Sequence, residues 1–323
     1  MTRPIRKTLI LAKLEGATYG VDASPANTDW LLVSNQSINP LVASNVDRGV
    51  LRNSLGGSEQ LVGTKYVECS FDIEIAGSGT ATTPPAWGKL VQACGFTQTV
   101  QTASVDYTPI TTMGSNTSLT ICYYLDGQLH KLLGARGTFS MEMGVGEKPV
   151  FRFRFLGLDG GLTAATNPTI SGDPWKTPLI ISEPNTGDVT LGAITYTSAT
   201  GVLSGGTAYV SRGLSIDVGN NVQHVPLLGR ETVDITARDA VGRVSFDLTA
   251  AQAVTFMADV LSNTTTGLGL THGTTDGNIV VVHAPKVQRI SPGVEDLNGN
   301  AFHTYQLRLI PTVGDDELRI VSR

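Results

Sequence analysis

The feature that most constrains the fold is a strict alternation of apolar and polar residues. From Val67 to Ile75, apolar side chains or cysteine alternate with charged residues or serine. Phe151 to Phe155 repeats the pattern, with arginine at both intervening positions. Because successive side chains of a strand point to opposite faces of its sheet, this period predicts half-buried antiparallel strands. The sequence therefore predicts an all-β fold.

Two short helices are predicted among the strands. After Pro84 and Pro85, one helix is expected to bury the residues at helical spacing, which are Trp87, Leu90, Val91 and Cys94. Gly95 is its expected end. A second helix is predicted from Ala250 to Leu261, with Thr249 as its cap. The apolar stripe of this second helix consists of Ala253, Val254, Met257, Val260 and Leu261.

The predicted elements occur in the same order twice. The first series has a strand at 31–39, a polar loop at 40–64, a strand with Ser70-Phe71-Asp72, the first helix and a hairpin at 137–158. The second has a strand at 209–218, a polar loop with Arg230 and Arg238, a strand with Ser245-Phe246-Asp247, the second helix and a hairpin at 286–309. Any two β domains with one helix share such an order, but the repeated Ser-Phe-Asp strand favours gene duplication.

A stretch rich in structure-breaking residues places the boundary between the two series. Between 163 and 184 these residues are Pro168, Gly172, Pro174, Pro178 and Pro184. We therefore predict a first domain at 1–165, a linker with an extra hairpin at 166–208, and a second domain at 209–323.

Composition limits the classes of function. Charged residues make up 16% of the chain, against about 25% in average domains, and the formal net charge is −5. Since affinity for phosphate comes mainly from lysine and arginine, specific nucleic-acid binding is disfavoured. The odd number of cysteines, Cys69, Cys94 and Cys122, fits a reducing compartment. No apolar stretch approaches the roughly 18 residues that span a bilayer, so we expect a soluble protein assembled in the cytoplasm.

Known motifs for catalysis, metals and cofactors do not occur in the sequence. The histidines do not stand at zinc-binding spacing; they are His130, His224, His272, His283 and His303. There is no G-x-S-x-G, P-loop or G-x-G-x-x-G sequence. We therefore expect a protein that is not an enzyme and that has no metal and no cofactor.

Several segments of the first half, read in order, resemble one protein family. They are Arg6 to Lys13, Thr18-Tyr19-Gly20, Leu32 to Asn35, Val46-Asp47-Arg48, Leu55 to Glu59, Ala86-Trp87-Gly88, Ala93 to Phe96, Asp126 to Lys131 and Gly134 to Gly137. Together they resemble the tail tube, or major tail, proteins of long non-contractile-tailed bacteriophages. In the second half the resemblance rests on element order and on the strand with Phe246.

This resemblance implies a fold and an assembly. The family's fold is a β-sandwich flanked by a helix, and six such domains form a ring in which neighbouring sheets join into a barrel. Two tandem tail-tube-type β-sandwich domains, each with one short helix, imply a homotrimer that forms a pseudo-hexameric ring. Stacked rings would form the virion tail and conduct DNA during ejection into the bacterial host.

The resemblance also implies partners and a location. The chain is expected to self-assemble in the host cytoplasm and to contact the tail terminator, distal tail and tape measure proteins. Double-stranded DNA would pass through the tube without specific binding, and no membrane is involved.

Acidic side chains on the polar strand faces are the candidate lumen-facing residues. They are Glu68, Asp72, Glu74, Glu142 and Asp247. Negative side chains on a conduit wall repel the polyanion and keep it sliding. The alternative is that they are ordinary solvent-facing positions or cross-strand partners of Arg152 and Arg154.

The polar loop at 40–64 is longer than most connections between strands. The resemblance implies that it reaches the adjacent ring, with Asp47, Arg48, Arg52 and Glu59 as candidate ring-stacking residues. The alternative is a mobile, solvated loop. The acidic segment at 315–317 and the basic residues at 3–6 would pair between rings or else be solvated.

Two other functions remain open at this point. One is a ring-forming tube of another injection system, such as a contractile tail, which shares fold and assembly. The other is a β-sandwich adhesion module that binds carbohydrate on the virion surface. Carbohydrate sites usually present exposed aromatic rings, and the chain has only the tryptophans Trp30, Trp87 and Trp175.

Overall fold

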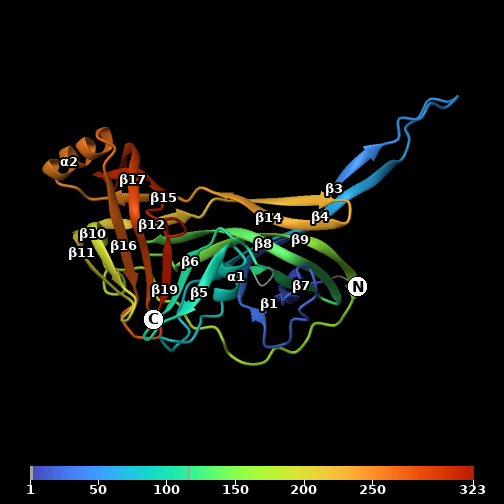
Figure 1. Cartoon of the computed structure of the whole chain (residues 1–323), viewed down its shortest axis with the longest axis horizontal. Coiled ribbons are helices and arrows are strands. Elements are labelled where there is room, and N and C mark those ends of the chain that lie inside the picture. The colour runs from blue at the N-terminus through green and yellow to red at the C-terminus, as the bar shows by residue number, and fades with distance from the viewer. Residues whose placement is uncertain (1–2, 115–116) are drawn as a thin grey trace.

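The computed structural model describes residues 3–114 and 117–323 and confirms the all-β prediction. Figure 1 shows a body of strands, with the β3–β4 hairpin projecting from one end and helix α2 at the other. The elements of the first half are η1 (Ile5–Lys7), β1 (Thr8–Leu14), β2 (Trp30–Leu31), β3 (Val33–Asp47), β4 (Gln60–Glu74), α1 (Gly88–Gln92), β5 (Phe96–Val100), β6 (Val105–Pro109), β7 (Leu119–Leu125), β8 (Gln128–Gly144) and β9 (Val150–Ala164).

The second half continues with strands and one longer helix. Its elements are β10 (Val189–Thr197), β11 (Val202–Tyr209), β12 (Ser211–Asp217), β13 (Asn220–Leu227), β14 (Arg230–Arg238), β15 (Val241–Phe246), α2 (Ala250–Leu261), β16 (Thr265–His272), β17 (Val280–Leu297), β18 (Asn300–Leu309) and β19 (Arg319–Ser322).

The strands of the two halves pair in matching orders, and all pairs are antiparallel. In the first half the order is β2, β1, β7, β8, β9, β4, β3. In the second half it is β11, β10, β16, β17, β18, β15, β12. The predicted hairpins at 137–158 and 286–309 are the pairs β8–β9 and β17–β18.

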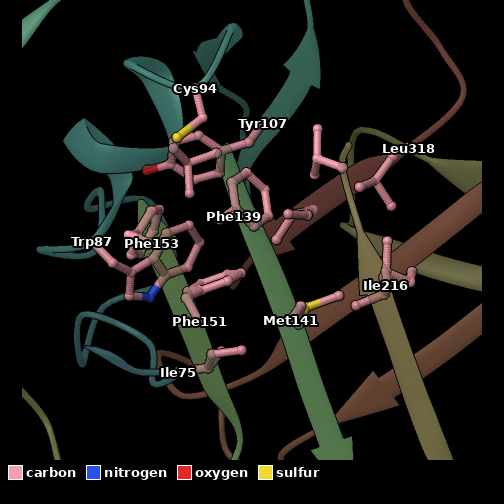
Figure 2. Packing of buried hydrophobic residues seen from close by; sticks show 14 of the residues in the cluster. Ile75, Trp87, Cys94, Tyr107, Phe139, Met141, Phe151, Phe153, Ile216 and Leu318 are labelled. Atoms are coloured by element: carbon pink, nitrogen blue, oxygen red, sulfur yellow. The ribbon is translucent and has the colours of Figure 1, made fainter. Parts of the chain in front are cut away.

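Two strand contacts join the halves into a single 17-stranded sheet. Strand β12 pairs with β8, and β19 pairs with both β17 and β6. Figure 2 shows Met141 on β8 and Ile216 on β12 packed beside each other in the core. One contiguous buried cluster extends from Ile10 to Ile320. Among the described residues of this one chain, the sheet does not close into a barrel.

The first helix is shorter than the spacing predicts. It covers Gly88–Gln92, yet the four apolar residues of the predicted stripe are all buried. The indole of Trp87 packs 5.0 Å from the ring of Tyr107 and 5.1 Å from that of Phe151, between ring centroids. Its Nε1 donates a hydrogen bond to the carbonyl of Ala76 at 2.8 Å. Buried indoles usually find such an acceptor.

The second helix has the predicted bounds but buries a different face. Val254, Met257 and Leu261 of the predicted stripe are 71%, 44% and 77% exposed, so this part of the prediction is wrong. The buried residue is Phe256, whose ring packs against Phe246 and its aromatic neighbours. Ala253 and Val260 of the predicted stripe are partly buried and pack against the core beside it, and Asp259 forms an ion pair with Arg289 of β17.

The predicted cap of α2 gives a testable effect on stability. The Thr249 hydroxyl accepts a hydrogen bond from the N–H of Gln252, whose side chain accepts one from the N–H of Thr249. Thr249→Ala is therefore expected to lower the free energy of unfolding by about 1 kcal/mol, measured by urea denaturation. Thr255→Ala, on an exposed turn of the same helix, is the control and should change it by less than about 0.5 kcal/mol. Equal losses for both variants would contradict the capping role.

The long polar loop predicted at 40–64 is wrong in part, because the two flanking strands extend into it. Strand β3 continues to Asp47 and β4 begins at Gln60, so only residues 48–59 connect them. We call the outer part of this hairpin, residues 42–66, the arm; it projects away from the body (Figure 1). The second predicted loop is likewise a hairpin, β13–β14, in which Arg230 begins and Arg238 ends the second strand. The arm carries polar residues on both faces, which removes the alternation that predicts strands. Strand β14 does alternate from Thr232 to Arg238, so the sequence carried a strand signal there.

The segment between the halves divides into two parts. Residues 165–188 contain no strand longer than an isolated bridge between Thr186 and His272. The hairpin that follows, β10–β11, joins the sheet through β10, which pairs with β16. Strand β11 therefore forms the edge. In the first half, β1 pairs with β7 in the corresponding way.

Candidate assembly surfaces

One face of the sheet is polar across both halves. Asp72, Arg152, Ser140 and Asp217 stand opposite one another on β4, β9, β8 and β12. Directly opposed residues share a face, and the neighbouring row, which includes Phe151 on β9, is buried. The polar row therefore lies on the side of the sheet away from the core.

The structure brings four of the five candidate lumen residues onto this face. Glu68 forms an ion pair with Arg154, and Glu74 pairs with Lys148 at 2.7 Å. Asp72 accepts a hydrogen bond from Asn35 at 2.8 Å. The contact of Glu68 with Arg154 agrees with the alternative that some of the acids are cross-strand partners of arginine.

The fourth candidate on this face is Glu142, and the fifth candidate, Asp247, lies elsewhere. Glu142 stands opposite Ser215, at the junction of β8 with β12. Asp247 is exposed and follows the last residue of β15. Two further residues, Arg243 and Arg308, were not predicted as site residues; they extend the polar face over the second half and form ion pairs with Glu295 and Asp239. Alternation within β15 and β18 was the signal for them. The face is thus mixed in charge.

The tip of the arm holds three of the four candidate ring-stacking residues together. Arg48 and Arg52 both contact the carboxylate of Glu59, the second at 3.0 Å. Asp47 lies at the end of β3, opposite Gln60. Exposed ion pairs contribute about 0–1 kcal/mol, so these bridges set the shape of the tip more than its stability.

The arm also carries exposed apolar side chains. Leu51 and Leu55 at its tip have exposed fractions of 101% and 105%, the values of a fully extended chain. Further along, Val46, Leu61 and Val62 are each more than half exposed. Apolar side chains gathered on a projecting element are typical of a surface that contacts another protein.

Within the chain, the acidic segment near the C-terminus contacts β14 and the first half, and its pairing with the basic N-terminus of another ring stays a prediction. Arg238 at the end of β14 binds Glu317 and, at 3.1 Å, Asp315. Asp315 also accepts hydrogen bonds from the N–H and hydroxyl of Thr111 at 3.0 and 2.7 Å. These groups line a cleft of about 480 Å³ between the halves. These ion pairs and hydrogen bonds join β14, the segment before β19 and the first half across the cleft.

A second charged cluster ties the last strand to the first half. Asp106 on β6 is 2% exposed and accepts hydrogen bonds from Arg319 at 2.8 Å and from the Tyr196 hydroxyl at 2.6 Å. The guanidinium of Arg319 lies 4.5 Å from the centroid of the Tyr196 ring. His283 on β17 stacks beside that ring, with 6.3 Å between centroids.

His283 makes the stability dependent on pH. Burial, with Arg319 nearby, lowers the pKa of His283 from 6.5 to about 4. Below pH 6.5 the unfolded chain therefore binds a proton that the folded chain does not, so stability falls as the pH decreases towards 4. Between pH 6.5 and 5 the loss from this group should be about 1.5 kcal/mol, measured by urea denaturation. In the His283→Asn variant this pH-dependent loss of unfolding free energy should disappear. An unchanged pH profile in the variant would show that His283 does not cause the loss.

The other candidate chemical groups lie in ordinary structural surroundings. Burial raises the pKa of the Cys69 thiol to about 12 and that of Cys122 to about 11, so both thiols stay protonated at neutral pH. Within residues 3–114 and 117–323, no group of three or more His, Cys, Asp or Glu side chains is placed to hold a metal ion. No helix in the part of the chain that the structure describes is long and apolar enough to cross a membrane.

The tryptophans do not offer a surface for sugar binding. Trp87 is 1% and Trp175 is 9% exposed, and Trp30 is half-buried with its ring centroid 6.4 Å from that of Trp175. Both indole N–H groups of this pair donate to backbone carbonyls. Nothing in this arrangement favours the carbohydrate-binding alternative.

Comparison with known proteins identifies the family. Curated proteins yield no match to this chain. A family model described as "Phage tail tube protein" matches residues 6–312, which include every strand from β1 to β18. The chain belongs to the phage tail tube protein family, and it is a structural component of the virion tail.

Proposed function

We propose that this chain is the major tail tube subunit, which polymerises into stacked rings and forms the conduit for DNA ejection. The family match across residues 6–312 is the observation that carries this proposal. It leaves no large part of the chain for a separate activity, and we propose a purely structural, non-enzymatic role. Assembly would take place in the host cytoplasm.

We further propose two tandem tube domains, at 1–165 and 209–323, joined by residues 166–208. The matching strand orders of the two halves support two domains. They also pair β10 of the joining segment with β16, so its β10–β11 hairpin packs as part of the second domain's sheet. Three chains would then supply six domains, and a homotrimer would form a pseudo-hexameric ring. Closure of neighbouring sheets into a ring would also remove the exposed sheet edges that otherwise promote aggregation.

The polar sheet face is the proposed wall of the lumen. Its acids alternate with Arg152, Arg154 and Arg243, so the wall carries both signs of charge close together, and Arg154 and Arg243 form ion pairs with Glu68 and Glu295. Paired charges present a weak net field to a polyanion, and arginines already bound to carboxylates are poor ligands for phosphate. Such a wall would let DNA slide without specific binding.

The arm is the proposed contact between rings. Its exposed Leu51 and Leu55 would be buried against the adjacent ring, while Arg48, Arg52 and Glu59 would hold the tip in shape. At the ends of the tube the proposed partners are the tail terminator and distal tail proteins, and the tape measure protein lies within the lumen.

Electron microscopy of the concentrated purified chain tests the proposed function. The proposal predicts hollow tubes of stacked rings that form without any other protein. The proposal would be contradicted if the chain stays monomeric at high concentration and is also not incorporated into tails when it is added to a phage-infected extract that lacks this protein.

A further inference from the structure

The junction between the two halves shows how one domain adds to another. Strand β9 pairs with β8 along its length. On the other side, β8 pairs with β7 up to Ala135 and then with β12 from Ser140 to Gly144. Strand β12 of the second half thus completes an edge that β7 leaves open.

The second half has the same open edge, and it is unfilled. Strand β17 pairs with β16 up to Gln288, while β18 takes its other side from Val287 to Leu297. Within the described residues, no strand pairs with β17 on the β16 side beyond Gln288. In this unpaired stretch Val294 is 66% exposed, whereas Phe139, which takes the matching position on β8, is buried.

The first half has the strand that would fill it. Among the described residues, β3 pairs with β4 alone and its outer edge is free, whereas the outer edge of β12 is bonded to β8. We propose that β3 of one chain pairs with β17 of the next chain, as β12 pairs with β8 within the chain. This inference rests on the proposed function and specifies the contact that closes its ring.

The strand register follows from residues at matching positions. Cys69 and Val244 each lie two residues before the phenylalanine of Ser-Phe-Asp, and they stand opposite Ile38 and Leu214. Asn39 on β3 therefore corresponds to Ser215 on β12.

The partner position follows in the same way. Phe71 stands opposite Phe153 on β9, which in turn stands opposite Phe139 on β8. In the second half, Phe246 stands opposite His303 on β18, which stands opposite Val294 on β17. Three residues further on, each hairpin ends with its last pair, at Glu142 and at Leu297.

Since Ser215 stands opposite Glu142, Asn39 is expected opposite Leu297 of the next chain. The adjoining Pro40 has no N–H, so the shared ladder is short and its specificity comes from side chains. In the internal junction, the N–H of Val218 donates to the carbonyl of Phe139 at 3.1 Å. The corresponding contact would bury the exposed Val294 against the base of the arm at Val42.

The arm itself would then have a place to lie. Within the chain, β12 and β15 lead into the β13–β14 hairpin, which lies across β8 and β9 (Figure 1). Its Val233 is fully buried, and Asp234 pairs with Arg136 of β8 at 2.8 Å. By the same relation, the base of the arm of one chain lies across β17 and β18 of the next chain in the ring, and the tip with Leu51 and Leu55 extends beyond it to the adjacent ring.

Cysteine cross-linking tests this register. Asn39→Cys with Leu297→Cys places two thiols on directly opposed residues, within the Cα separation of 4.4–6.8 Å that a disulfide needs. The native cysteines are buried and do not compete. Mild oxidation of assembled protein should give covalent dimers and trimers on a non-reducing gel, with the trimer as end product.

The matched control is Asn39→Cys with Asp296→Cys. Asp296 is exposed but adjacent, so its side chain points to the opposite sheet face and this variant should stay monomeric on the gel. Tubes that form without any cross-link in the Leu297 variant would overturn the register and leave the tube function standing. A chain that forms neither rings nor tubes would contradict both.

A second variant needs no disulfide chemistry. Val294→Asp should keep the thermal midpoint of the monomer, since the side chain is 66% exposed there, and should lower ring formation at least tenfold. Normal ring formation by a folded Val294→Asp variant would also overturn the proposed contact.

Discussion

Replacing Asp106 by alanine is expected to lower the free energy of unfolding by about 2–4 kcal/mol. Removing one partner of a buried ion pair typically costs about 3–5 kcal/mol, and Arg319 is 30% exposed, so water recovers part of this loss. The hydroxyls of Ser104 and Tyr196 also lose their acceptor. The measurement is urea denaturation of the isolated chain.

The control for this prediction is Asp276→Ala. Asp276 is 78% exposed and lies 3.9 Å from Arg323, so this variant removes an aspartate–arginine contact at the surface. Its effect should stay below about 0.5 kcal/mol. Comparable losses in the two variants would show that the cluster around Asp106 does not tie β19 to β6.

Serine at both Leu51 and Leu55 is expected to prevent the growth of tubes while leaving the monomer stable. Both side chains are fully exposed in the single chain, so the thermal midpoint should not change. Burying a leucine stabilises a contact by about 1.5–3 kcal/mol, and about 1.4 kcal/mol corresponds to tenfold in affinity. The critical concentration for tube formation, measured by sedimentation, should therefore rise at least about tenfold.

Val313→Ser provides the comparison for this double variant. Val313 is 91% exposed but lies outside the arm, before β19. It should leave the critical concentration within about twofold of the unmodified chain. If the arm variant assembles as readily as Val313→Ser, the arm does not hold the rings together.

Local patterns were sufficient to predict the central strands and the position of α2. The alternation around Phe71 and Phe153 arises because these strands bury one face and expose the other. Thr249 followed by Gln252 marks the start of α2, because both side chains satisfy backbone groups at that end. Such signals depend only on neighbours in the sequence.

Features that depend on distant partners could not be predicted. The arm lacks alternation because both of its faces are open in the single chain, so residues 40–47 and 60–64 read as a loop. Arg238 and Glu317 are 79 residues apart, and nothing in either sequence segment indicates their contact. The acids of the polar face were predicted, with Arg154 as one possible partner, but the contact of Glu74 with Lys148 depends on where the turn between β8 and β9 lies beside β4.

The rotational symmetry of assembled tubes tests the central claim most directly. Cryo-electron microscopy of tubes grown from the pure chain should show rings of three chains with six similar lobes, in which β3 of each chain lies beside β17 of the next. Rings of six chains, or neighbouring chains whose sheets do not touch, would contradict the account.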